Sequence, residues 1–252
     1  EQNLLRDSVS KFCVSDYDFE TRMKSVNSDS GHNPEHWKLF AELGWLAIPF
    51  SEDLGGLEGG DVDLSLMFEE FGKSIVVEPY LANVVLSGGV IKRSDLENKA
   101  ELIEHLITGE NQISLANYEP KKGFNLDNVN CEISEDGSVS GLKTTVLNAS
   151  NADFFLVFGK HQAGHAFALI SKDAVGSKVT PYKTYDGFVS GDLNLKNCKA
   201  ETIFSSSNAL DILRESVNEA IVCVCSEAIG AMERCYKLTI EYTCLLYTSD
   251  AA

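Results

Sequence analysis

The stretch that decides the fold is residues 138–159, SVSGLKTTVLNASNADFFLVFG. It holds two β-rich runs, 138–147 and 154–159, separated by a short segment rich in Asn, Ala and Ser. Just before it, Asp136-Gly137 is the residue pair typical of a tight turn between antiparallel strands. The stretch therefore predicts antiparallel β structure in the middle of the chain.

This β-rich pattern extends from residue 111 to about residue 205. Short apolar and β-branched runs alternate there with turns, at the close spacing typical of a small antiparallel barrel or sandwich. We therefore expect a middle β domain over 111–205. Its predicted strands are 112–118, 129–133, 138–147, 154–159, 166–171 and 178–182, with a further strand near 191–195.

Helical patterns flank the β region on both sides. Apolar residues recur every three to four positions through much of 1–110, as over 62–73. The four glycines within 55–60 indicate a loop in which the backbone approaches its neighbours closely. A phosphate-binding loop is not expected there, because its Gly-Lys-Ser/Thr motif is absent. After residue 205 the pattern predicts one long helix over 208–243. The residues predicted to face inward on this helix are Leu213, Val217, Ala220, Val224, Ala228, Ala231 and Leu238.

The order of these patterns predicts an α+β protein. An N-terminal all-α domain occupies 1–110, a middle antiparallel β-barrel or sandwich domain 111–205, and residues 206–243 form the first helix of a C-terminal helical-bundle domain. Residues 244–252 do not continue the helical pattern and are expected to form a non-matching tail. A lone long helix cannot bury its own apolar stripe. Either a partner covers this helix, or the chain lacks the rest of a helical domain.

The charge of the chain limits its partners. The 252 residues include 21 Lys and Arg against 38 Asp and Glu, so the net charge is −17. An acidic surface repels nucleic-acid phosphates and anionic lipid, and neither is expected as a partner.

The same residues set expectations for location and metals. No run approaches the ~20 apolar residues that span a bilayer, and residues 1–7 do not resemble a signal peptide. The seven cysteines form no Cys-x-x-Cys pair, and the five histidines show no ligand spacing. His161 and His165 lie near a predicted hairpin and are expected to be exposed. These observations favour a reduced, cytoplasmic protein without a metal site.

Several motifs, taken in order and spacing, resemble the acyl-CoA dehydrogenase family of flavoenzymes. The first third carries WKLFAELGWLAIP at 37–49, Gly55-Gly56, and FEEFG at 68–72. SLANYEP at 114–120 stands where the family has a flavin-binding strand that ends in Thr-Glu-Pro. The resemblance covers roughly residues 1–243. Its remaining motifs are GLKTTVLNA at 141–149 with Ala152-Asp153, Tyr185-Asp186-Gly187, and EAIGAME at 227–233.

The resemblance implies oxidation of an acyl-CoA thioester to the α,β-enoyl-CoA in fatty acid metabolism, with FAD as the cofactor. In the family a carboxylate base removes the α-proton while the β-hydride passes to the flavin. An electron-transferring flavoprotein then takes the electrons. The resemblance also implies a homo- or hetero-oligomer when the protein is full length.

Residue by residue, the resemblance places the flavin against two segments. The predicted cofactor contacts are Leu115, Asn117, Tyr118, Thr145, Leu147 and Asn148, and the predicted substrate contacts are Gly123 and Phe124. Phe124 has an alternative role, filling an edge of the β domain. The basic pair Lys121-Lys122 is expected to be a solvated turn, with contact to CoA phosphates as the alternative.

The chain departs from the family at three flavin positions. Tyr118 replaces the usual Thr, and Thr145 and Leu147 stand where the family often has Trp and Thr. Leu147 cannot donate a hydrogen bond, so backbone amides or Asn148 would have to do so. The alternative is that Thr145 and Leu147 are ordinary core positions of a strand. The departures indicate a divergent branch, one that acts on bulky or dicarboxylic acyl groups or that supplies one of two unequal subunits.

No residue is assigned as the catalytic base. In most of the family the base, a Glu, lies in the C-terminal domain, as does an Arg-x-Gln-Phe-Gly segment that would be expected directly after residue 243. Glu119 corresponds to a structural Glu of the family. We therefore expect a C-terminally truncated fragment that is inactive alone. The alternative is a non-catalytic binding or assembly subunit, whose final helix docks on a complete partner within a heteromeric complex.

Overall fold

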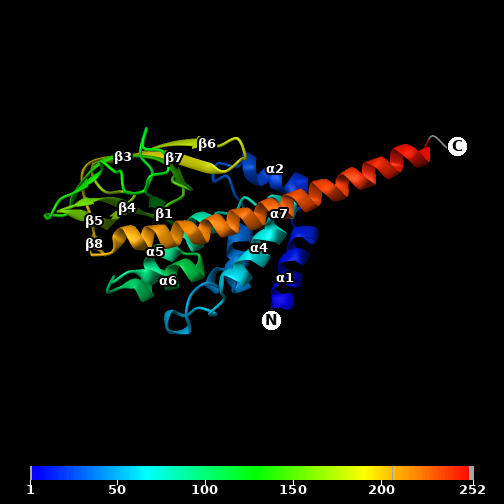
Figure 1. Ribbon diagram of the computed structural model, residues 1–252, viewed down its shortest axis with the longest axis horizontal. Coiled ribbons are helices and arrows are strands. Elements are labelled where there is room, and N and C mark those ends of the chain that lie inside the picture. Colours follow the sequence, from blue (N-terminus) through cyan, green and yellow to red (C-terminus); the bar gives the residue numbers. More distant parts are fainter. Residues whose placement is uncertain (1, 206, 250–252) are drawn as a thin grey trace. The chain divides into compact units, whose positions relative to one another are not determined.

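The computed structural model describes residues 2–205 and 207–249 (Figure 1). Residues 1 and 206, and 250–252 of the predicted tail, lie outside the described residues. The helices before the sheet are α1 (Gln2–Ser15), α2 (Phe19–Asn27), α3 (Pro34–Glu42), the short 3₁₀ turns η1 (Trp45–Ala47) and η2 (Glu52–Leu54), α4 (Asp61–Ser74), the π-helical η3 (Leu81–Ser87), α5 (Gly88–Arg93) and α6 (Lys99–Thr108).

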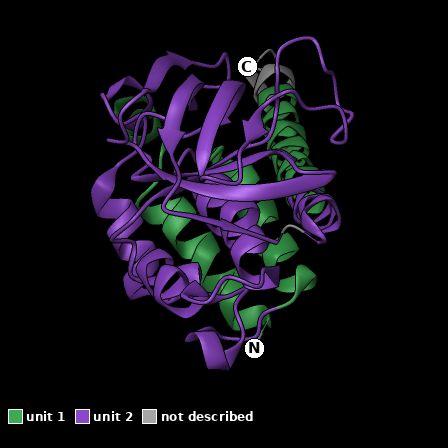
Figure 2. Cartoon of the chain, turned by 90° about the vertical axis from the view of Figure 1, so that its left-hand side faces the viewer, with its two compact units in different colours: residues 1–24, 60–76, 221–252 green, residues 25–59, 77–220 purple. Residues whose placement is uncertain are grey.

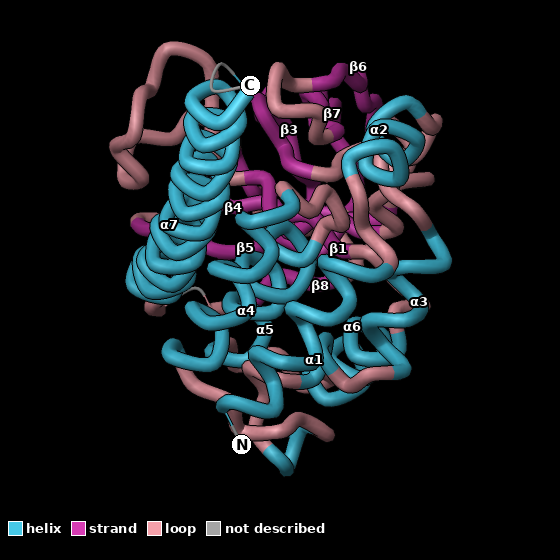
Figure 3. Tube along the Cα trace, turned by 90° about the vertical axis from the view of Figure 1, so that its right-hand side faces the viewer, coloured by secondary structure: helices cyan, strands magenta, loops and turns pink. Residues whose placement is uncertain are grey.

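Eight strands and one long helix follow, which confirms the predicted α+β order (Figure 3, strands in magenta). The helix α7 spans Ala209–Ser249 and continues beyond its predicted end at residue 243. The strands are β1 (Ile113–Ala116), β2 (Glu132–Ile133), β3 (Ser138–Leu147), β4 (Phe154–His161), β5 (Gly164–Ser171), β6 (Ser177–Lys183), β7 (Val189–Lys199) and β8 (Thr202–Phe204).

The chain divides into two compact units (Figure 2). One consists of residues 1–24, 60–76 and 221–252, and the other of residues 25–59 and 77–220. The second unit holds all eight strands, and therefore every residue predicted to contact flavin or substrate. The domain boundaries predicted at residues 110, 205 and 243 remain predictions.

The strands form one sheet in the order β6-β7-β3-β2-β4-β5-β8, and β1 pairs with β4 beside this path. Most pairs are antiparallel, as predicted, but β1 and β2 run parallel to β4. Parallel neighbours need a crossover connection, and the chain between β1 and β4 is long enough to supply one. The predicted hairpin at Asp136-Gly137 is confirmed, because β2 and β3 pair antiparallel on either side of it.

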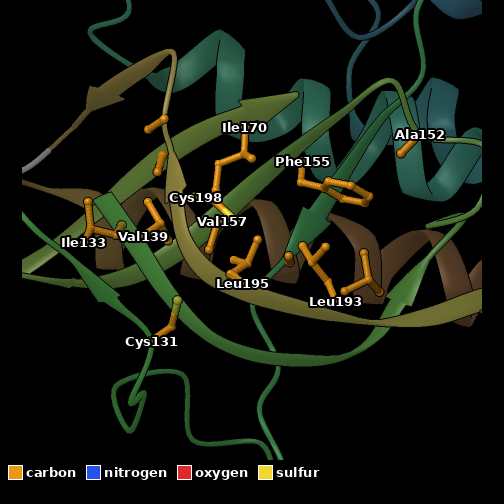
Figure 4. Packing of buried hydrophobic residues seen from close by; sticks show 14 of the residues in the cluster. Cys131, Ile133, Val139, Ala152, Phe155, Val157, Ile170, Leu193, Leu195 and Cys198 are labelled. Carbon is orange, nitrogen blue, oxygen red and sulfur yellow. The ribbon is translucent and has the colours of Figure 1, made fainter. Parts of the chain in front are cut away.

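Buried apolar side chains from several strands pack together into one hydrophobic core (Figure 4). Phe155 and Val157 of β4 pack with Ile170 of β5 and with Leu193 and Leu195 of β7. Each such side chain stabilises the fold by about 1.5–3 kcal/mol when it leaves water. This core fixes the strands that carry the predicted site residues.

The predicted inward face of α7 is only partly right. Leu213 and Ala220 are buried, and Val217 and Ala231 are partly buried. Val224 and Leu238 are each 46% exposed, and Ala228 is exposed. Cys223 and Gly230 are buried instead, because the face of this part of α7 is decided by its contact with α4.

Two glycines set the contact between α4 and α7. A Cβ on Gly72 of α4 would collide with the carbonyl oxygen of Glu227, and a Cβ on Gly230 of α7 would collide with that of Glu69. The contact is reciprocal, and on both sides the obstacle is backbone, which cannot move aside as a side chain can. Lys73 of α4 adds an ion pair with Glu233, at 3.2 Å.

Among the described residues, no helix combines the length and the apolar character that crossing a membrane requires.

We predict that Gly230→Ala lowers the free energy of unfolding by about 1–3 kcal/mol, the usual cost of overpacking. The clash with the Glu69 carbonyl should outweigh the higher helix propensity of Ala. Chemical denaturation of the two proteins measures the difference. Gly60→Ala is the control for steric overlap, because its Cβ would meet nothing within 4 Å. Since Gly60 is the N-cap residue of α4, where Ala is disfavoured, this change should cost no more than about 1 kcal/mol. Equal effects of the two substitutions would contradict the assignment of this contact.

Candidate functional site

The first predicted segment lies at the end of β1. Leu115 is buried, Tyr118 is partly buried, and Asn117 is 9% exposed. The Asn117 Nδ2 atom is buried and has no hydrogen-bond partner among the described residues. A buried donor without a partner costs about 1–3 kcal/mol. An acceptor on a ligand would remove that cost, so Asn117 fits a cofactor edge that carries carbonyl oxygens or ring nitrogens.

The second predicted segment lies at a bulge in β3. Its pairing with β7 shifts register between Lys143 and Val146, and Thr145 adopts a left-handed backbone with φ of 53°. A bulge re-aims a side chain out of the strand's regular alternation. Thr145 is exposed, and its hydroxyl lies 3.4 Å from the Tyr182 hydroxyl. The prediction that Thr145 is an ordinary core position is therefore wrong, whereas Leu147 is partly buried.

Asn148 ends the second segment, and its side chain is held inside the protein. Its Nδ2 donates to Gln112 Oε1 at 2.6 Å, and its Oδ1 accepts from Asn151 Nδ2 at 2.7 Å. Its backbone N–H donates to the Val189 carbonyl at 2.8 Å. One N–H and one acceptor lone pair of its amide remain for a ligand. The bond to Gln112 also ties the residue before β1 to the residue after β3.

A buried ion pair just after the C-terminal end of β1 joins the first predicted segment to the second. Lys143 Nζ donates to Glu119 Oε1 at 2.7 Å, with side-chain exposures of 0% and 3%. Lys143 Nζ also lies 3.5 Å from the Asn117 carbonyl oxygen, and the Thr144 N–H donates to the Tyr118 carbonyl at 2.9 Å. Residues 117–119 are thereby fastened to residues 143–144.

Glu119 is held as a carboxylate. Its oxygens accept from the N–H groups of Asn130 at 2.6 Å and Cys131 at 2.9 Å, in addition to Lys143. Burial opposes ionisation, but the hydrogen bond and charge of Lys143 and the two N–H groups hold the pKa of Glu119 below its ordinary value of 4.5. A carboxylate so engaged cannot accept a substrate proton. The prediction that Glu119 is structural is consistent with these contacts.

The predicted substrate contacts lie on a loop after Glu119. Gly123 adopts φ of 60° with open space where a Cβ would be, and the Phe124 side chain is 92% exposed. The prediction that Phe124 fills an edge of the β domain is therefore wrong. Lys122 Nζ donates to Asn128 Oδ1 at 2.8 Å and to Asn130 Oδ1 at 3.1 Å, which braces the loop on itself.

Two histidines lie elsewhere on the sheet and are partly buried, so the prediction that they are exposed is wrong. His161 Nδ1 lies 2.9 Å from the Ile133 carbonyl oxygen. The His165 ring stacks on Phe158 with centroids 5.0 Å apart. Both rings pack within the fold because the hairpin that carries them lies beside β2.

Sequence patterns missed one residue of this arrangement, Gln112. It accepts from Asn148 and donates its backbone N–H to Asp153 Oδ2 at 2.9 Å. Its only signal in the sequence is its place as the first residue of the strand predicted over 112–118. The pairing with Asn148 joins residues far apart in the chain, and local periodicity carries no information on such contacts.

Comparisons with known proteins relate the chain to one family. Residues 1–110 match the family model described as the acyl-CoA dehydrogenase N-terminal domain. Over 96% of its length the chain is 27% identical to the L-prolyl-[peptidyl-carrier protein] dehydrogenase of a Serratia species and 22% identical to the acyl-CoA dehydrogenase IpdE2 of Mycolicibacterium smegmatis. Residues 1–110 thus carry an acyl-CoA dehydrogenase N-terminal domain, and over 96% of its length the chain is similar to these dehydrogenases.

A solved structure agrees with this similarity at the level of the fold. A glutaryl-CoA dehydrogenase from Mycobacterium smegmatis, in complex with FADH2, superposes with a TM-score of 0.85 at 22% identity and covers 96% of the chain. The chain spans about two thirds of these proteins, namely 67% and 64% of the two relatives and 65% of the solved chain.

We predict that the ionised carboxylate of Glu119 adds to the free energy of unfolding at neutral pH and that this contribution is lost in acid. Since the folded state lowers the pKa of Glu119 below 4.5, its ionised form stabilises the fold above that pH, and this stabilisation is lost as the pH falls through the folded pKa. The double variant Glu119→Gln/Lys143→Met lacks this titration. Between about pH 6 and about pH 3 it should lose less free energy of unfolding than the wild-type chain. An equal loss in both proteins, measured by urea denaturation, would show that Glu119 does not titrate in this way.

Proposed function

We propose that this chain binds FAD and takes part in the α,β-dehydrogenation of an acyl-CoA thioester, with an electron-transferring flavoprotein as the electron acceptor. The observation that carries the proposal is the buried, unpartnered amide of Asn117, on a strand end that resembles the family's flavin-binding strand. The dehydrogenase relatives and the FADH2 in a structure of the same fold support it.

The two segments around the buried ion pair would hold the flavin. Asn117 would donate its free amide N–H, and the exposed Thr145 would offer its hydroxyl. Leu115, Tyr118 and Leu147 would supply apolar and aromatic surface, and Asn148 its remaining amide N–H. When bound, the flavin supplies the hydride acceptor that no side chain can provide.

Gly123 and Phe124 would meet the acyl thioester. Their loop is exposed, so a bound substrate would cover Phe124 and keep water from the reacting carbons. Glu119 is not the base, because its two oxygens are occupied by Lys143 and two backbone N–H groups. We assign the base to sequence outside these 252 residues, since the family's base lies in its C-terminal domain.

We predict that Asn117→Ala raises the dissociation constant for FAD about threefold to tenfold, the cost of one hydrogen bond. Titration followed by the fluorescence of FAD measures it. Asn128→Ala is the matched control, because Asn128 is an exposed residue of the same region that accepts only a hydrogen bond from Lys122 among the contacts of its side chain. No saturable binding by the wild-type chain would overturn FAD binding. If the wild-type chain and Asn117→Ala bind FAD with equal affinity, Asn117 does not contact the cofactor.

One observation fits the second function, that of a non-catalytic assembly subunit, and it fits equally a chain that lacks the rest of its helical domain. Between residues 221 and 242, α7 exposes a row of uncharged residues spaced alternately three and four apart, as in the seam of a coiled coil. Its charged residues fall on other positions. The row consists of Val222, Cys225, Ile229, Met232 and Tyr236.

If the chain assembles through this row, Ile229→Glu should dissociate the assembly, because it places a charge in an apolar interface. Sedimentation velocity would then show the wild-type chain as an oligomer and the variant as a monomer. Arg234→Glu, on another face of α7, is the control and should leave the oligomer intact. A wild-type chain that sediments as a monomer would contradict self-assembly through α7.

A further inference from the structure

The two segments of the proposed flavin site are not neighbours in the sheet. Among the described strands, β1 pairs with β4, while β3 pairs with β2 and β7. Backbone ladders therefore do not set the position of residues 115–118 relative to residues 145–148. Other contacts must do so.

Side chains supply most of these contacts. At the end of β1, Lys143 reaches both Glu119, at 2.7 Å, and the carbonyl of Asn117, at 3.5 Å. At its start, Gln112 bonds to Asn148 at 2.6 Å. One backbone bond, from the Thr144 N–H to the Tyr118 carbonyl, stands beside the ion pair.

Glu119 also closes the loop that carries Gly123 and Phe124. The carboxylate stands at the start of that loop and accepts the N–H groups of Asn130 and Cys131 at its end. One charged group thus joins three parts of the proposed site: the end of β1, the bulge of β3 and the substrate loop.

The burial of the pair argues for a role beyond stability. Lys143 has no exposed side-chain surface, and removing two charges from water is costly. Replacing such a pair with apolar residues is often neutral or stabilising for the fold. Apolar residues cannot form the directional hydrogen bonds that the pair makes: Lys143 to Glu119 and to the Asn117 carbonyl, and Glu119 to two backbone N–H groups.

We propose that Glu119 and Lys143 are positioning residues, which hold the two flavin-binding segments and the substrate loop in the arrangement that binds the cofactor. This inference rests on the proposed function for the identity of the ligand. The geometry of the pair itself does not depend on it.

The double variant Glu119→Gln/Lys143→Met tests the inference. It removes both charges and leaves no unpaired ion. The amide oxygen introduced at position 119 keeps one of the two bonds from Asn130 and Cys131, whose N–H groups donate to different oxygens of the Glu119 carboxylate. We expect a cooperative unfolding transition near neutral pH, with a midpoint lowered by the loss of this one hydrogen bond. The dissociation constant for FAD should nevertheless rise about tenfold to a hundredfold, as when residues that orient metal ligands are removed.

The control is Lys172→Met, which removes a partly exposed ion pair with Asp153, at 3.1 Å. It should change the FAD dissociation constant by less than about twofold, because exposed pairs contribute little. A double variant that unfolds cooperatively and binds FAD as tightly as the wild-type chain would overturn the inference. If the double variant fails to fold, Glu119→Asp, which shortens the carboxylate by one methylene, takes its place with the same expectations.

Amide hydrogen exchange separates this inference from the proposed function. The Thr144 N–H, bonded to Tyr118, should exchange at least about tenfold faster in the double variant, while amides in the β4–β5 ladder keep their rates. If the wild-type chain does not bind FAD, the proposed function fails, and this exchange alone decides whether the pair positions the segments. Unchanged exchange at Thr144 would overturn the inference in that case.

Discussion

A lysine with no solvent exposure meets a carboxylate 2.7 Å away where β1 ends, and the candidate site depends on that contact. Lys143 can stay charged in the interior only because Glu119 faces it. Glu119 in turn is satisfied by two N–H groups from the far end of the substrate loop. Removing either partner would leave a buried charge unpaired. It would also leave the two segments, which no sheet ladder joins, with only the Gln112–Asn148 and Thr144–Tyr118 bonds between them among the contacts described above.

Much of the fold could be predicted from sequence, because its elements follow local rules. The strand at 138–147 has the bounds predicted for it, set by Asp136-Gly137 before it and a polar segment after it. The helix predicted over 62–73 is α4 within one residue at each end. The elements that the sequence did not predict include α2, which has no fully buried apolar stripe, and β8, a three-residue strand whose partner, β5, lies more than 30 residues earlier in the chain.

The candidate site was less predictable, because its contacts join distant residues. The resemblance identified the segments 115–118 and 145–148. It did not predict that Gln112 holds the Asn148 side chain or that Thr145 lies on a β-bulge. The inward face of α7 was misjudged for a similar reason. Apolar periodicity predicts that Val224 and Leu238 face inward, whereas Gly230 is the residue that meets the backbone of α4, and Val224 and Leu238 are each 46% exposed.

The proposal that the end of β1 and the bulge of β3 form one flavin-binding surface can be tested on the chain itself. Backbone amide chemical shifts recorded during a titration with FAD give the position of the ligand residue by residue. The largest changes should fall on residues 115–118 and 145–148, with smaller ones on the loop of Gly123 and Phe124. Changes confined to the helices α1 and α4, with none in these two segments, would contradict it.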